Sequence, residues 1–139
     1  MVSTIKRPFI FKEGRFGLTE VSYTNVKSFA SRGSKERVSI SNTNNTIWFH
    51  ITYKDNIVGV CALYLAKNKC RIKGDWIIPE YRGKGLGEFI TTSRLDIIRS
   101  LGYRQVEVLT LHPKYYALKG FNILNERRKG VWYATRSIE

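Results

Sequence analysis

The chain has 139 residues, of which 42% are hydrophobic, 13% aromatic and 25% charged, a composition typical of a folded protein rather than a disordered one. This length suits one core, and we expect residues 1–139 to form a single domain. Lysine and arginine number 24 against 11 aspartate and glutamate, so the net charge of +13 favours anionic partners and disfavours small polycations as substrates.

Cysteine usage and hydropathy bear on the compartment. Cys61 and Cys70 lie in strand-like segments, and we expect both thiols to be reduced. No apolar run approaches the roughly 18 residues needed to cross a membrane, and the N-terminus lacks the apolar segment and cleavage site of a secretory signal. The sequence therefore predicts a cytoplasmic protein with no membrane contact.

The N-terminal third carries the weaker patterns. Residues 7–12 (RPFIFK) are predicted to form a first strand, and residues 16–21 form a second apolar segment. Residues 24–30 (TNVKSFA) favour a short helix that Gly33 ends. Residues 39–46 are rich in turn-forming side chains and are predicted to be a loop.

The pattern is clearer from residue 47 onwards. Residues 47–53 (IWFHITY), 57–65 (IVGVCALYL) and about 71–78 are rich in β-branched and aromatic side chains, which predicts three strands. Short polar segments at 54–56 and 67–69 separate them, as hairpin turns would. The sequence therefore predicts an antiparallel meander.

A long helix follows a glycine-rich segment. Residues 87–101 place apolar side chains on one face, and Gly102 is expected to end the helix.

The C-terminal segments complete the predicted fold. Residues 105–109 read as a strand, residues 113–119 as a short helix with proline in its first turn, and residues 121–124 with 130–137 as a hairpin. This order predicts the α/β (α+β) class, with one central mixed, mainly antiparallel sheet flanked by helices.

The segment PEYRGKGLGEFI (79–90) places glycines at 83, 85 and 87 beside Arg82 and Lys84, at a strand-to-helix junction. A helix N-terminus with flexible backbone and nearby cations is suited to an anionic ligand such as phosphate. The spacing fits neither the Walker loop nor the dinucleotide-binding fingerprint.

Residues 82–87 (RGKGLG) resemble the R/Q-x-x-G-x-G/A pyrophosphate loop of the GNAT superfamily of acyl-CoA N-acyltransferases, and residues 116–121 (YALKGF) resemble its Y-x-x-x-G-F segment. The turn DNIVGV at residues 55–60 also matches the family, and the resemblance covers roughly residues 46–138. It implies transfer of an acetyl or other short acyl group from acyl-CoA to an amine, by direct attack in a ternary complex.

The resemblance also implies roles for particular residues. By this resemblance, the strand end before the loop is expected to pair with pantetheine, and the loop is expected to bind the pyrophosphate. Tyr116 is the implied general acid near the sulfur of coenzyme A, with Tyr115 as its rival and a core position as its structural alternative. The implied cofactor-binding residues are Ile77, Ile78, Arg82, Gly83, Lys84, Gly85, Leu86 and Gly87.

The general base is less clearly indicated. Because strand side chains alternate, Arg71, Lys73 and Asp75 are expected to share a face, on which only Asp75 accepts a proton. We take Asp75 as the catalytic candidate, although an ion pair is its structural alternative; Glu107 and His112 are the second and third candidates.

Two departures from the family pattern concern the acceptor. Arg71 and Lys73 stand where relatives often have acidic or histidine side chains, which suits an anionic acceptor. The segment before Tyr116 and the N-terminal half are both short, which predicts an open cleft and a macromolecular acceptor, with nucleic acid as one candidate.

Two alternatives remain open from the sequence. The charge and compactness also suit an enzyme that modifies adenine in DNA, similar to the phage Mom-type proteins. A non-catalytic nucleic-acid-binding module is the other. The spacing of the histidines and cysteines predicts no metal site.

Overall fold

One eight-stranded sheet forms the centre of the computed structural model, which describes residues 6–138. Its strands follow the order β1-β2-β3-β4-β5-β6-β8-β7, and every neighbouring pair is antiparallel except β5 with β6. The mixed, mainly antiparallel sheet expected from the sequence is confirmed. The strands are β1 (Ile10–Glu13), β2 (Phe16–Val21), β3 (Thr46–Tyr53), β4 (Asn56–Leu65), β5 (Cys70–Ile77), β6 (Gln105–Thr110), β7 (Asn122–Arg128) and β8 (Val131–Ser137).

The N-terminal helix does not lie where the sequence predicted. Two 3₁₀ turns, Tyr23–Asn25 and Lys27–Phe29, come first, and α1 (Ala30–Lys35) follows them. Gly33 was expected to end a helix but lies inside α1. The position requires glycine because a Cβ there would come within 2.6 Å of the Ile40 side chain. Close packing, rather than helix termination, explains this glycine.

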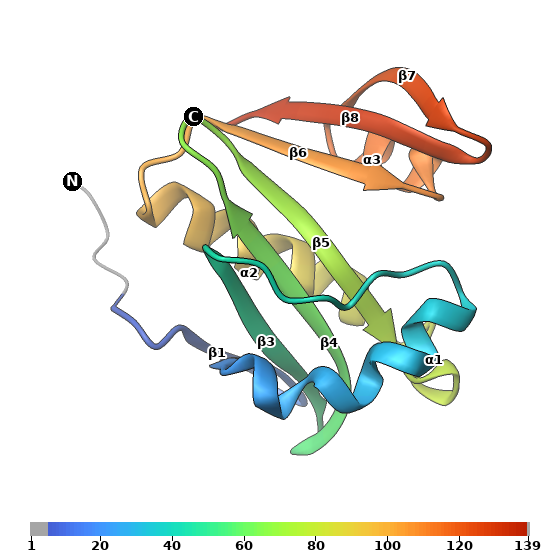
Figure 1. The fold of residues 1–139 in the computed structure, drawn as a ribbon. Helices are drawn as coiled ribbons and strands as arrows, with labels where there is room; N and C mark the ends of the chain where they lie inside the picture. The colour runs from blue at the N-terminus through green and yellow to red at the C-terminus, as the bar shows by residue number, and fades with distance from the viewer. Residues whose placement is uncertain (1–5, 139) are drawn as a thin grey trace.

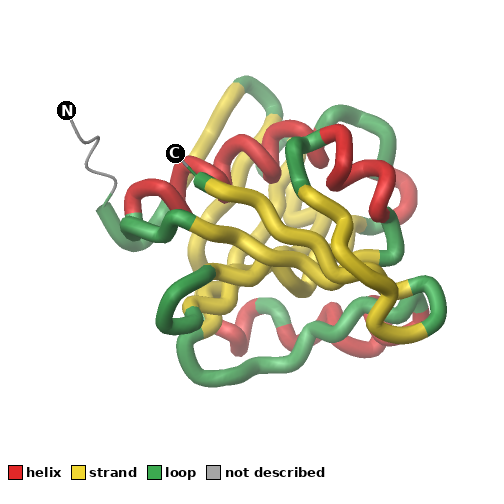
Figure 2. Tube along the Cα trace, turned by 90° about the horizontal axis from the view of Figure 1, so that it is seen from above, coloured by secondary structure: helices red, strands yellow, loops and turns green. Residues whose placement is uncertain are grey.

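Helices lie on both faces of the sheet (Figure 2). Helix α2 (Leu86–Ser100) follows Gly85, whose φ is 90°, and ends shortly before Gly102, whose φ is 85°. The short α3 (Pro113–Leu118) begins with a proline, as the sequence predicted. No helix within residues 6–138 is long and apolar enough to cross a membrane.

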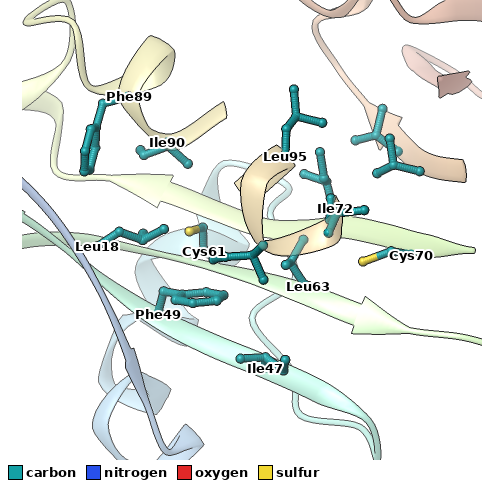
Figure 3. Packing of buried hydrophobic residues seen from close by; sticks show 14 of the residues in the cluster. Leu18, Ile47, Phe49, Cys61, Leu63, Cys70, Ile72, Phe89, Ile90 and Leu95 are labelled. Atoms are coloured by element: carbon teal, nitrogen blue, oxygen red, sulfur yellow. The ribbon is translucent and has the colours of Figure 1, made fainter. Parts of the chain in front are cut away.

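The larger core lies between the sheet and α2. Figure 3 shows Phe89, Ile90 and Leu95 of α2 beside the sheet residues Cys61 and Ile72. The smaller core lies on the opposite face, where the side chains from the sheet are Trp48, Val60, Ala62 and Trp76 and those from the N-terminal segment are Val26 and Ile40. Each side chain of β5 therefore belongs to one of two distinct layers.

A β-bulge in β5 reverses this assignment partway along the strand. Trp76 pairs with Val60 and Lys73 with Ala62, so two β5 residues lie opposite Cys61 alone. One of them is Gly74, whose φ is 69° and whose Cβ, if present, would lie 3.0 Å from the Trp48 ring. Glycine is required there, since other residues rarely adopt this conformation.

The expectation that Arg71, Lys73 and Asp75 share a face is therefore wrong. Lys73 lies over the Trp48 ring on the α1 face, whereas the Asp75 carboxylate bonds to Arg94 of α2. The extra residue in the bulge shifts the alternation by one, so side chains after it point to the other face.

The parallel strands β5 and β6 separate near the same place. They pair only from Cys70 opposite Val106 to Ile72 opposite Val108, although β5 continues to Ile77. In Figure 1 the two strands start side by side and then diverge, with α1 near the far end of β5. The backbone of β5 beyond Ile72 therefore has no partner strand on that side.

Candidate active site

A cleft of about 620 Å³ occupies the space between the diverging strands. Its walls come from β5, from the end of β6 with the start of α3, from residues 36–39 after α1, and from β7 and β8. Of the catalytic and cofactor-binding candidates named from the sequence, the cleft is lined by Asp75, Ile77, Arg82, His112 and Tyr116. The sheet topology thus brings together residues that are up to 41 positions apart in the chain.

The glycine loop lies at one end of β5 and leads into α2. Gly83 and Gly85 have φ values of 78° and 90°, which favour glycine at both positions. The backbone N–H groups of residues 83–88 have no acceptor within residues 6–138, and Lys84 is exposed without an ion-pair partner among them. These donors lie at the positive end of a 15-residue helix, an arrangement that is suited to binding an anion.

The other predicted cofactor residues differ in burial and in whether their backbone groups already have a hydrogen-bond partner within the protein. Leu86 is buried in the core, and a Cβ on Gly87 would lie 3.2 Å from the Tyr115 hydroxyl. The N–H of Ile78 donates to Val58 O at 2.8 Å, so β4 already uses it. The Ile77 carbonyl accepts a bond from Arg82 Nε at 2.8 Å.

Arg82 is fully engaged with other parts of the protein. Its Nη1 and Nη2 each lie 2.9 Å from an oxygen of the Glu36 carboxylate. Trp76 Nε1 donates to the same carboxylate at 2.7 Å. These bonds, that from Arg82 first, lower the pKa of Glu36. Glu36 therefore remains ionised at neutral pH.

Asp75 is held by a buried arginine. Arg94 is 2% exposed, its Nη1 donates to Asp75 Oδ1 at 2.7 Å and to Ala62 O at 3.1 Å, and its Nη2 contacts Asp75 Oδ2. Burial lowers the pKa of Arg94, but the charge and the hydrogen bonds of Asp75 outweigh burial and raise it. Asp75 is thus the counter-ion of a buried charge, which favours a positioning role over proton transfer.

The two adjacent tyrosines point to different places. Tyr116 lines the cleft, whereas the Tyr115 hydroxyl bonds to Thr91 Oγ1 at 3.0 Å on α2. Burial and the negative charge of Asp75 raise the pKa of Tyr116, so its hydroxyl keeps its proton. The raised pKa makes this phenol a weaker acid than a free tyrosine, but its O–H can donate a hydrogen bond to a leaving thiolate and pass its proton to the sulfur as negative charge develops there.

The other two base candidates differ sharply. Glu107 is 5% exposed and accepts bonds from Tyr133 at 2.7 Å, Lys69 at 3.0 Å and Arg71 at 2.7 Å. Burial raises the pKa of Glu107, but these three donors outweigh it and lower the pKa. His112 lines the cleft, and its ring has no hydrogen-bond partner in the described part of the chain.

Positive charge in the cleft exceeds what the protein neutralises. Lys73 donates to Ser41 O at 3.2 Å, and Arg37 donates to Lys129 O at 3.0 Å. Arg128 has no acidic partner within residues 6–138. Burial and the charge of Arg71 lower the pKa of Lys73. An acceptor with an anionic group would supply the missing counter-charge.

Three residues of the site were not identified from the sequence. Arg94 had a local signal, since it follows Ile90 and precedes Ile98 at four-residue spacing on the apolar face of α2. Gly74 had a weak one, because glycine inside a strand often marks a bulge. Glu36 had none, because it meets Arg82 across 46 residues.

The chain is similar in sequence to proteins of one known family. Residues 18–121 match the acetyltransferase (GNAT) family. An uncharacterised N-acetyltransferase of Chlorobaculum tepidum is 24% identical over 99 residues, which cover 69% of this chain and 64% of the relative.

Solved structures have a similar fold. N-acetylglutamate synthase of Neisseria gonorrhoeae, solved with coenzyme A and N-acetyl-glutamate, matches with a TM-score of 0.73 at 15% identity, over 92% of this chain and 36% of that one. A GNAT family acetyltransferase of Elizabethkingia anophelis with acetyl-CoA bound matches with a TM-score of 0.67 at 11% identity, and the match covers 90% of this chain and 99% of that one.

Proposed function

The chain belongs to the acetyltransferase (GNAT) family, and from this premise we propose that it transfers an acetyl or other short acyl group from acyl-CoA to an amine in the cleft between β5 and β6. The observation that carries the proposal is the placement of unpartnered amides 83–88 at the N-terminus of α2, beside the unpaired edge of β5. The pyrophosphate binds these amides and Lys84. The pantetheine extends along β5, which directs the thioester into the cleft.

Acyl transfer follows by direct attack in a ternary complex. The amine nitrogen bonds to the thioester carbonyl carbon, and the carbon–sulfur bond breaks. We assign the proton lost by nitrogen to His112, because it lines the cleft and its ring has no hydrogen-bond partner in the described part of the chain. The departing thiolate takes a proton from Tyr116.

The acceptor is an amine that carries an anionic group. Lys73, Arg37 and Arg128 line the cleft without acidic partners in the described part of the chain, whereas the carboxylates Glu36 and Asp75 are each paired with an arginine. An anion bound by these cations would stabilise the complex and hold the amine near the thioester. The cleft is open, so this anionic group can belong to a small molecule or to a macromolecule.

Isothermal titration with acetyl-CoA, and in parallel with coenzyme A, tests the cofactor site. Micromolar binding is expected for both ligands. Lys84→Gln should weaken binding several-fold because it removes a charge beside the phosphate site, whereas Lys67→Gln, in the exposed turn before β5, should not. Absence of binding would contradict the proposal, and salt-sensitive binding of DNA alone would favour the non-catalytic alternative.

A further inference from the structure

Glu36 and Arg82 connect two parts of the site that are distant in sequence. Glu36 follows α1 directly and lies on the cleft wall, and Arg82 is the first residue of the RGKGLG segment. Their side chains meet in a bidentate contact with both nitrogen–oxygen distances at 2.9 Å. The loop expected to bind phosphate is thus tied to the wall of the acceptor cleft.

This contact leaves Arg82 unable to bind phosphate with its planar fork. Both terminal nitrogens are on Glu36, and Nε is on the Ile77 carbonyl. Bidentate recognition of phosphate needs two of these nitrogens on the ligand. Arg82 must therefore leave Glu36 before it contributes such a contact to the cofactor.

The contact is also one that a ligand can replace. The side chains of Arg82 and Glu36 are 43% and 42% exposed, so water and salt screen their attraction. A pyrophosphate carries more negative charge than one carboxylate and also gains the amides of the loop. A more highly charged anion on the loop can therefore displace the carboxylate from Arg82.

Glu36 has a second partner that holds it in place during the exchange. Trp76 Nε1 donates to Oε2 at 2.7 Å, and the Trp76 ring is 4% exposed, packed against Phe29 at 6.0 Å between centroids. Loss of Arg82 leaves this bond intact. The carboxylate then stays on the cleft wall without its cationic partner.

We propose that Glu36 competes with the acyl-CoA phosphates for Arg82, so that cofactor binding transfers Arg82 to the phosphates and leaves the Glu36 carboxylate free in the acceptor cleft. This inference rests on the proposed function. It makes Glu36 a positioning residue: the free enzyme holds Arg82 on Glu36, and only the loaded enzyme presents this carboxylate to the amine of an acceptor in the cleft.

A double-mutant cycle on acetyl-CoA binding tests the competition. Glu36→Gln keeps an oxygen for Trp76 Nε1 but removes the charge that holds Arg82, so acetyl-CoA affinity should rise several-fold. In the Arg82→Ala background the same substitution should change affinity less than twofold, because no arginine remains to be released. Circular dichroism establishes that each variant is folded.

Glu80→Gln is the matched control, since Glu80 acts on Arg82 only through its charge and makes no hydrogen bond to it. Two results would overturn the competition. One is an equal gain in acetyl-CoA affinity from Glu80→Gln and from Glu36→Gln. The other is an equal effect of Glu36→Gln on this affinity in the presence of Arg82 and in the Arg82→Ala background. In NMR spectra, the indole N–H signal of Trp76 should keep its hydrogen-bonded position when acetyl-CoA is added; its loss would contradict the retained contact. If the unaltered protein fails to bind acetyl-CoA, the proposed function itself is contradicted. If it binds acetyl-CoA but Glu36→Gln has no effect on affinity, only the competition is contradicted.

Discussion

Asp75 and Tyr116 both line the cleft, but their surroundings give them different chemistry. Asp75 balances the buried charge of Arg94, so its carboxylate is committed to the folded structure. Tyr116 packs edge-on against Tyr115 and Phe121 with centroids 5.1 Å away, which fixes the ring while the phenol remains at the cleft. A rigid, protonated hydroxyl is suited to proton donation.

Replacing Tyr116 by phenylalanine should lower kcat about 100-fold and leave acetyl-CoA affinity nearly unchanged, because the substitution removes only the proton donor. Turnover is followed by release of coenzyme A with the acceptor once identified, and affinity by titration. Tyr115→Phe is the control and should retain turnover, since its hydroxyl bonds to Thr91 on α2. Equal turnover in Tyr116→Phe and the unaltered enzyme would reduce Tyr116 to a packing residue.

Asp75→Asn should destabilise the fold by about 2 kcal/mol, because Arg94 would keep a buried charge without its counter-ion. The figure is below that of a fully buried pair because the Asp75 side chain is 38% exposed. Urea denaturation measures the change. Asp96→Asn, which removes an exposed pair with Arg99 on the same helix, should cost about 0.5 kcal/mol or less. Unchanged stability with lost turnover would instead make Asp75 the base.

Strand β5 performs three tasks along its length. Its first residues pair with β6. Its bulge at Gly74 shifts the alternation, so that the side chains after it point to the opposite faces of the sheet. Its last residues form the free edge beside the glycine loop. The Arg71–Glu107 contact at 2.7 Å joins β5 to β6 just before they separate. This junction therefore holds the two strands together at the point from which they diverge.

The junction predicts a dependence of stability on pH. Its donors lower the pKa of Glu107 in the folded protein. The resulting stabilisation is therefore complete above the ordinary glutamate pKa of about 4.3, which applies to the unfolded chain. It is lost as pH falls through the lower pKa that Glu107 has in the folded protein. Glu107→Gln should therefore be less stable at pH 7 by about 2 kcal/mol, and the difference should shrink in acid. Denaturation at several pH values measures it, with the exposed Glu13→Gln as control. A constant difference down to pH about 2 would refute this account.

Over the entire chain, the net charge of +13 reinforces the local cation excess of the cleft. Long-range attraction of this kind raises the local concentration of anions and is screened by salt. Acetyl-CoA affinity should fall about tenfold when ionic strength rises from about 0.05 to about 0.5 M. Acetyl-pantetheine lacks the phosphates, so its affinity should hardly change; an equal effect of salt on the affinities of both ligands would contradict electrostatic attraction.

The sequence by itself determined the meander, the glycine loop, the long helix and the terminal hairpin. These elements depend on rules that act over a few residues, such as alternation in Ile47–Tyr53 and the left-handed backbone at Gly85 and Gly102. The family resemblance followed from the same local segments, and the match over residues 18–121 confirms it.

Only the tertiary structure decided which residues meet. Gly74 shifts the alternation of β5 because the Trp48 ring and β4 constrain it, and this moves Asp75 from the face of Lys73 to Arg94. Arg82 meets Glu36 instead of remaining free for phosphate, since the two are 46 residues apart and are joined only by the folded sheet. Local patterns specify strands and turns, but burial and distant charges decide what each side chain contacts, and therefore what chemistry it can perform.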